Sequence, residues 1–115
     1  MTLSEQQRLF TSLLPQLITW AYTHGYELTL GDAYRDPRLH GAVGVKMGYG
    51  HPSSCHKIRM AIDLNLFKDG VFLQASSDHA PLGAYWKSLH PLCRWGGDFS
   101  TPDGNHYSME WLGQQ

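Results

Sequence analysis

The sequence predicts an α+β domain, in which helices pack on a small antiparallel sheet. Two stretches with helical spacing of apolar residues, and several short stretches in which apolar and polar residues alternate, support this class. At 115 residues the chain is long enough for one compact domain with its own core and too short for two. We therefore expect residues 1–115 to form a single domain.

The first helix is predicted from apolar residues that recur every three or four positions near the N-terminus. Ser4 and Gln7 have the arrangement of a capping box, and the pattern that follows them ends near Gly25. Pro15 lies inside this pattern and should kink or split the helix, because proline cannot donate a backbone hydrogen bond.

A second helix is predicted between residues 76 and 91. Its N-terminus has three candidate capping residues at 76–78, and Pro81 is tolerable in a first turn. Leu82, Tyr85, Trp86 and Leu89 then form an apolar stripe that ends before Pro91. We expect this stripe to pack on the sheet.

Strands are predicted where apolar and polar residues alternate. Asp69-Gly70 is typical of a tight hairpin turn, so the segments on either side of it should pair. Residues 36–54 contain glycine and proline but little periodicity, and we expect a long irregular loop of a kind that often carries function. The expected strands comprise residues 26–30, 60–67, 71–73 and 106–112.

Composition argues against several classes of protein. A formal net charge of -1 makes nucleic acid an unexpected partner. No apolar window reaches the roughly 20 residues that cross a bilayer, and the N-terminus lacks the pattern of a secretory signal, so we expect synthesis in the cytoplasm without membrane insertion. Cys55 and Cys93 form no CxxC pair; we expect buried or free thiols, and a bridge between them stays open.

His56 and Asp63 are candidate metal ligands because Asp63 interrupts an apolar strand pattern. Zinc ligands lie about 2.0 to 2.2 Å from the metal, so two ligating atoms can be only about 3 to 3.5 Å apart. Positions seven apart are separated by roughly 10 Å in a helix and by about 23 Å in a straight strand. His56 must therefore lie on a turn that folds back beside the strand of Asp63, with the reversal within residues 57–61.

A second cluster is formed by Asp103 and His106, where a turn precedes a predicted strand. With His56 and Asp63 it completes the residues of a catalytic zinc site, namely three ligands, an open water position and a general base. His51 is an alternative ligand, because it also precedes Asp63. Each cluster alone is more often structural or exposed, so only the two together predict a metal site.

The ordered set of motifs resembles the zinc peptidases of the D-alanyl-D-alanine carboxypeptidase and phage L-alanyl-D-glutamate endolysin family. The motifs are Ser54-x-His56, Ala61-x-Asp63, Trp95-Gly96-Gly97-Asp98 and Asp103-x-x-His106. The resemblance implies a Hedgehog/DD-peptidase-like fold and one zinc ion held by His56, Asp63 and His106. It also implies that Asp103 is the catalytic base.

Further site residues are implied by the same resemblance. Arg35 matches the family's site arginine, which would bind substrate and stabilise charge in the reaction, although a solvated surface arginine is an equal alternative. Ser54 would contact substrate or orient the site, unless it only caps the loop. Asp98 would hydrogen-bond a ligand histidine, or cap the turn after residue 97. Arg59 departs from the family, which commonly has glycine there, and this puts the loop around His56 in question.

The sequence therefore predicts a zinc metallopeptidase that cleaves the stem peptide of bacterial peptidoglycan. An aspartate base resembles the phage endolysin branch, which implies an L-alanyl-D-glutamate endopeptidase for host-cell lysis, without a separate wall-binding domain. We expect a monomer that is made in the host cytoplasm and reaches periplasmic peptidoglycan through other phage proteins. The alternatives are a D-alanyl-D-alanine carboxypeptidase and a non-catalytic wall-binding domain with a retained zinc site. A purely structural zinc is disfavoured, because such sites usually have four ligands rich in cysteine.

Overall fold

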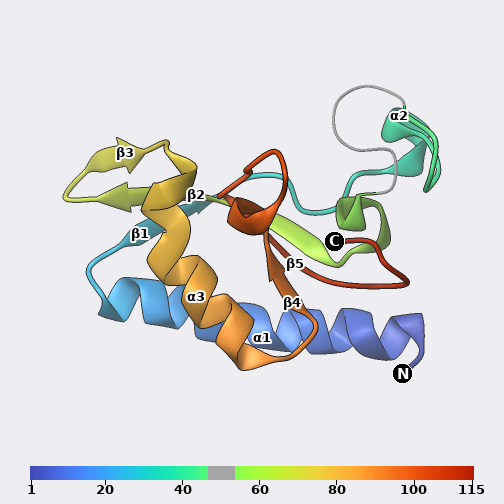
Figure 1. The fold of residues 1–115 in the computed structure, drawn as a ribbon, viewed down its shortest axis with the longest axis horizontal. Coiled ribbons are helices and arrows are strands. Elements are labelled where there is room, and N and C mark those ends of the chain that lie inside the picture. Colours follow the sequence, from blue (N-terminus) through green and yellow to red (C-terminus); the bar gives the residue numbers. More distant parts are fainter. Residues whose placement is uncertain (47–53) are drawn as a thin grey trace.

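The computed structural model describes residues 1–46 and 54–115 and shows a five-stranded antiparallel sheet packed against helices (Figure 1). This arrangement confirms the predicted α+β class. His51, the alternative ligand, lies outside the described residues. In the described part of the chain no helix is long and apolar enough to span a membrane.

The first helix, α1, spans Leu3–Thr23, and its N-cap, Thr2, lies two residues before the predicted N-cap, Ser4. Thr2 Oγ1 accepts from the Glu5 backbone N–H at 3.1 Å, and Glu5 Oε1 accepts from the Thr2 N–H at 3.0 Å. The assignment to Ser4 and Gln7 was therefore wrong. Thr2-x-x-Glu5 fits the same pattern, and its carboxylate is favoured over an amide beside the positive end of the helix dipole.

Pro15 does not split α1, which is assigned as one continuous helix. The prediction of a break failed because the proline is exposed. The backbone carbonyl that loses its partner is that of Thr11, four residues earlier, and Thr11 is also exposed. Water can satisfy this carbonyl, so the missing hydrogen bond does not interrupt the helix.

The sheet has the strand order β1-β2-β5-β4, and the short strand β3 pairs with the far end of β2. The predicted hairpin at Asp69-Gly70 is confirmed, since both residues have positive φ between β2 and β3. Strand β4 was not predicted, because its three residues are too few to show an alternation. The strands span Glu27–Leu30 (β1), Ala61–Lys68 (β2), Val71–Leu73 (β3), Cys93–Trp95 (β4) and His106–Met109 (β5).

Short helices connect these strands. The predicted loop after residue 36 contains a single helical turn, and the predicted second helix is confirmed, with a 3-10 turn before it. These helices are α2 (Pro37–His40), η1 (Cys55–Ile58), η2 (Ser76–His79), α3 (Ala80–Leu89) and η3 (Gly96–Asp98). Of these, η1 and η3 lead directly into the site described below.

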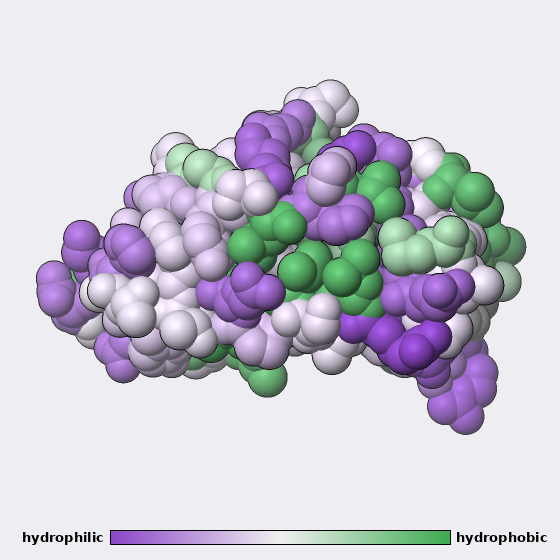
Figure 2. Space-filling view, turned by 90° about the horizontal axis from the view of Figure 1, so that it is seen from below, coloured by the Kyte–Doolittle hydropathy of each residue, from purple (hydrophilic) through white to green (hydrophobic). Residues whose placement is uncertain are grey.

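Side chains along β2 alternate between the buried core and the opposite face of the sheet, which carries the candidate site. Leu64 and Leu66 are fully buried in the core, whereas Asp63 and Asn65, which alternate with them, are only partly buried. Helices α1 and α3 pack on each other and on the sheet. Figure 2 shows the molecule from the side of α1, where apolar residues gather in the middle of the face and polar residues flank them.

Both cysteines are buried free thiols, which excludes a bridge between them. Burial raises the pKa of Cys55 and of Cys93 to about 12. Each thiol therefore behaves as a small apolar side chain at neutral pH.

Candidate metal centre and active site

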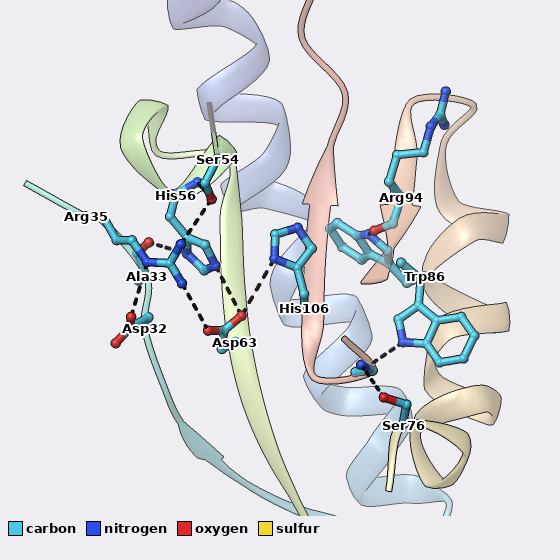
Figure 3. A network of polar contacts seen from close by, with 12 residues as sticks. Asp32, Ala33, Arg35, Ser54, His56, Asp63, Ser76, Trp86, Arg94 and His106 are labelled. Carbon is cyan, nitrogen blue, oxygen red and sulfur yellow. Dashed lines mark hydrogen bonds and ion pairs between the residues drawn. The ribbon is translucent and has the colours of Figure 1, made fainter. Parts of the chain in front are cut away.

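Strand pairing brings Asp63 and His106 together. They are direct partners in the antiparallel register of β2 and β5, so their side chains lie on the same face of the sheet (Figure 3). The register continues beyond the strand, where the Leu64 N–H donates to the carbonyl of Asn105 at 2.9 Å. Two residues 43 positions apart in sequence thus become neighbours.

His56 reaches the same face from η1, the 3-10 turn before β2. Ser54 caps this turn, and its Oγ accepts from the His56 backbone N–H at 3.2 Å. The turn ends at Arg59 with φ of 58°, a left-handed conformation that reverses the chain into β2. This is the reversal that the seven-residue spacing between His56 and Asp63 requires.

Arg59 adopts the left-handed backbone conformation that favours glycine, so the turn forms with arginine at this position. Its guanidinium carbon lies 4.0 Å from the centroid of the Tyr34 ring, a cation–π contact. Such a contact contributes about 0.5–1 kcal/mol at an exposed site, which offsets part of the cost of about 1–2 kcal/mol for a left-handed residue with a side chain.

The three candidate ligands converge on one point. His56 Nε2 lies 3.1 Å and His106 Nδ1 lies 3.7 Å from the same oxygen, Oδ1 of Asp63. One ligating atom from each residue fits within 4.8 Å of the others. These separations are close to the 3 to 3.5 Å or so expected for atoms that share one zinc ion.

The hydrogen bonds of His56 fit a metal ligand. Its Nδ1 lies 2.7 Å from the carbonyl oxygen of Ala33, which can only accept, so Nδ1 carries the proton. A protonated Nε2 would donate to Asp63 Oδ1 at 3.1 Å, whereas in the neutral ring Nε2 presents a lone pair to this oxygen, which is also an acceptor. A cation between the two atoms removes this repulsion, and the backbone carbonyl orients the ring as the outer partner of a metal-binding histidine does.

His106 is held in the neutral form that metal binding needs. Burial, followed by repulsion from His56, lowers its pKa to about 4, although Asp63 acts in the opposite direction. The 3.7 Å between its Nδ1 and Asp63 is too long for a hydrogen bond. Two imidazoles and a carboxylate, with one imidazole kept neutral, therefore fit a divalent metal better than they fit a bridging proton.

Asp103 lies at the edge of this group, on the turn before β5. Partial desolvation, and then repulsion from Asp63, raises its pKa, while His56 and Arg35 act against the shift. Its backbone is fixed on both sides, because its N–H donates to the Gly96 carbonyl at 2.9 Å and its carbonyl accepts from the His106 N–H at 3.1 Å. A carboxylate with a raised pKa beside a set of metal ligands can accept a proton and return it.

Gly96 makes this arrangement possible. A Cβ at this position would lie 2.0 Å from the carbonyl oxygen of Asp103 and 2.8 Å from Cβ of His106. Only glycine allows the two backbone segments to approach so closely. The Trp-Gly-Gly-Asp motif was used only as part of the family resemblance, and the packing role of its first glycine was not predicted.

Arg35 and Ser54 both belong to the site. The Arg35 guanidinium lies 3.3 Å from Asp32 Oδ2, 3.9 Å from Asp63 Oδ2 and 3.3 Å from Ser54 Oγ (Figure 3). With its side chain only 12% exposed, Arg35 is not a solvated surface arginine. Ser54 caps η1, and its Oγ also accepts from Arg35, while its contact with substrate stays a prediction. Asp32 was not predicted, because nothing in its local sequence marks it.

Asp98 does not bond a ligand histidine in the described structure. Its Oδ2 accepts from Lys87 Nζ of α3 at 2.7 Å, and the side chain is half exposed. The outer partner of His56 is the carbonyl of Ala33 instead. The acceptor beside His56 Nδ1 is thus a backbone carbonyl, which leaves no signal in the sequence.

A cavity of about 910 Å³ opens over the site. Arg35, Asp103 and His106 line it on one side, and the C-terminal segment 113–115 lines it on another. One candidate ligand, the carboxylate of Asp103 and the guanidinium of Arg35 therefore line a space that is large enough for a peptide.

Comparison with known proteins assigns this site to a family. Residues 48–109 match the family described as D-alanyl-D-alanine carboxypeptidase, and this segment contains all three candidate ligands and Asp103. A search of curated proteins gives no match. Because the match covers more than half of the chain and includes its metal-binding group, the chain belongs to the D-alanyl-D-alanine carboxypeptidase family of peptidases.

Proposed function

We propose that the protein is a zinc metallopeptidase that cleaves the stem peptide of bacterial peptidoglycan, with the bond between L-alanine and D-glutamate as its target. The observation that carries this proposal is the convergence of His56, Asp63 and His106 on one point, where His106 and the neighbouring Asp103 line one large cavity. Three ligands leave a tetrahedral ion with an open position, which distinguishes a catalytic zinc site from a structural one.

The roles of the residues follow from their chemistry. His56, Asp63 and His106 would hold one zinc ion, which supplies Lewis-acid chemistry and lowers the pKa of water to about 7. Asp103 takes the proton from the attacking water and passes it to the leaving amine. The raised pKa of Asp103 suits this double duty, because proton exchange is most efficient when the pKa approaches the working pH.

Arg35 is the residue that we assign to the negative charge of the substrate. Its guanidinium can bind a carboxylate through two parallel hydrogen bonds, and it can also stabilise the oxyanion that forms during amide hydrolysis. Contacts to Asp32 and Ser54 fix its position before substrate arrives. Substrate would therefore meet a preorganised cation.

Two candidate bonds in the stem peptide fit this arrangement. The volume of about 910 Å³ favours an endopeptidase, because it lies near the upper end of the 300–1,000 Å³ or so that is usual for ligand sites and exceeds the needs of one terminal alanine. The description of the matched family favours the second candidate, a D-alanyl-D-alanine carboxypeptidase. The endopeptidase proposal includes an endolysin role in phage lysis, with a monomer acting on periplasmic peptidoglycan.

The test is digestion of purified peptidoglycan by the zinc-loaded protein, followed by mass spectrometry of the fragments. New L-alanine carboxyl ends with matching D-glutamate amino ends are expected. Release of single D-alanine residues would overturn the endopeptidase assignment in favour of the carboxypeptidase. Unchanged peptidoglycan, with zinc bound to the protein in a 1:1 ratio, would instead identify a non-catalytic binding domain.

A further inference from the structure

A second cavity lies behind Asp103. It has a volume of about 240 Å³ and lies beside Leu64 and Asn65 of β2. At this point the strand paired with β2 changes from β5 to β3. Asp103 lines both this cavity and the larger one over the metal-binding group. The candidate base therefore stands between two spaces, and a bound peptide could extend from one to the other across it.

The walls of the second cavity carry uncharged hydrogen-bonding groups. Among the described residues that line it there is no lysine or arginine, and Asp103 provides its one carboxylate. The larger cavity, in contrast, contains the guanidinium of Arg35. The polar side chains of the second cavity are Asn65, Gln74, Ser76, His79 and Asn105.

His79 is the most deeply buried of these polar residues. It is 3% exposed, and burial lowers its pKa, so the ring is neutral at neutral pH. Its Nδ1 pairs with the hydroxyl of Tyr107 at 2.8 Å, which orients the ring and leaves Nε2 for another partner. Whichever nitrogen carries the proton, this edge of the ring can donate or accept one hydrogen bond.

The turn between the two cavities is bonded to and packed against η2. The Gly104 N–H donates to Ser76 Oγ at 2.9 Å, which connects the turn of Asp103 to η2 (Figure 3). A Cβ at Gly104 would lie 2.4 Å from Cα of Ser76, so the two segments are in direct contact. The second cavity thus keeps its shape next to the base.

We propose that this second cavity is a substrate subsite that takes the uncharged, amide-bearing part of the peptide on the acyl side of the cleaved bond. The inference rests on the proposed function. In both candidate bonds, the residue whose amine leaves carries a free carboxylate, which suits the side of Arg35. The acyl side must then occupy the cavity that has no cation.

This placement also discriminates between the two candidate bonds. On the acyl side of the L-alanine–D-glutamate bond the substrate has L-alanine and a lactoyl group, which are small and uncharged. On the acyl side of the terminal D-alanine bond it has a D-alanine preceded by a diamino acid with a charged side chain. A cavity of about 240 Å³ without a cation fits the first and disfavours the second, because desolvation of the ammonium group is costly and its only carboxylate partner among the described lining residues would be the proposed base, Asp103.

The binding test uses two peptide probes and nuclear magnetic resonance of the zinc-loaded protein. Lactoyl-L-alanine N-methylamide is the uncharged probe, and N-acetyl-L-lysyl-D-alanine N-methylamide is the charged control. The uncharged probe should shift the side-chain amide signals of Asn65, Gln74 and Asn105, and bind about tenfold more tightly than the control, because the lysyl ammonium group of the control must lose its hydration. Equal binding of the two probes, or shifts confined to residues around Arg35, would overturn the inference.

Variants locate the site and separate this inference from the proposed function. Gln74→Trp should fill the cavity from its exposed rim and weaken probe binding at least tenfold, whereas Gln16→Trp on the exposed face of α1 should not change it. Asn65→Leu should weaken binding by about tenfold through loss of its amide. Probe binding without cleavage of peptidoglycan would refute only the proposed function. Cleavage with no binding at this cavity, or with binding unaffected by Gln74→Trp, would refute only the subsite.

Discussion

Replacement of Gly96 by alanine tests whether close backbone packing positions the catalytic group. The new methyl group would lie 2.0 Å from the Asp103 carbonyl oxygen, far inside van der Waals contact, and 2.8 Å from Cβ of His106. Relief requires the turn of Asp103 to move by about 1 Å, and a displacement of this size can reduce the rate of reaction by about 10²-fold. Overpacking should also lower the free energy of unfolding by about 1–3 kcal/mol.

The assay for Gly96→Ala combines kcat/KM on a soluble stem peptide with thermal unfolding and metal analysis. Gly70→Ala is the matched control, because Gly70 has φ of 76° with open space around it and lies in the β2–β3 hairpin. The control should lose stability through backbone strain of about 1 kcal/mol while keeping kcat/KM. If Gly96→Ala keeps kcat/KM within threefold of the unmodified protein, the packing argument for Asp103 is wrong.

Three further predictions concern the metal, the thiols and acid stability. Asp103→Asn should keep one equivalent of zinc by elemental analysis and lose at least 10²-fold in kcat, while His106→Ala should lose both zinc and activity. Loss of zinc from Asp103→Asn would contradict the assignment of Asp103 as a base that is not a metal ligand. Cys55 and Cys93, whose pKa values burial raises to about 12, should react with a thiol reagent only after unfolding, and rapid labelling of the native protein would contradict their burial. Burial lowers the pKa of His79 below 6.5, so the unfolded chain binds this proton first as the pH falls, and the free energy of unfolding should decrease below about pH 6.5. Denaturant titrations should show a weaker decrease in His79→Gln. Identical pH profiles of the two proteins would contradict the shift.

Local patterns in the sequence predicted the elements of the fold better than their ends. The hairpin at Asp69-Gly70 was predictable because its turn chemistry is local. The start of α1 was misplaced because Thr2-x-x-Glu5 and Ser4-x-x-Gln7 both fit a capping box, and the choice depends on where the helix meets the rest of the chain. Strand β4 was missed because a three-residue strand is defined by its partner β5, not by its own pattern.

The candidate ligands could be selected from the sequence because metal chemistry restricts the residue types and the spacing restricts the chain path. What the sequence could not show is the register that sets Asp63 opposite His106, since strand pairing is a long-range property. The partner of Asp98 was also out of reach, because Lys87 approaches it only once α3 has packed beside η3.

Backbone groups orient His56, and residue types in the sequence cannot indicate such contacts. The carbonyl of Ala33 determines which nitrogen of His56 carries a proton, and the N–H of Arg35, two residues later, donates to the carbonyl of His56 at 3.0 Å. One short segment after β1 therefore orients the ligand ring, and the same segment carries the guanidinium that faces the substrate cavity. A change in this segment should alter metal affinity and substrate binding together, because the positions of His56 and Arg35 depend on the same backbone.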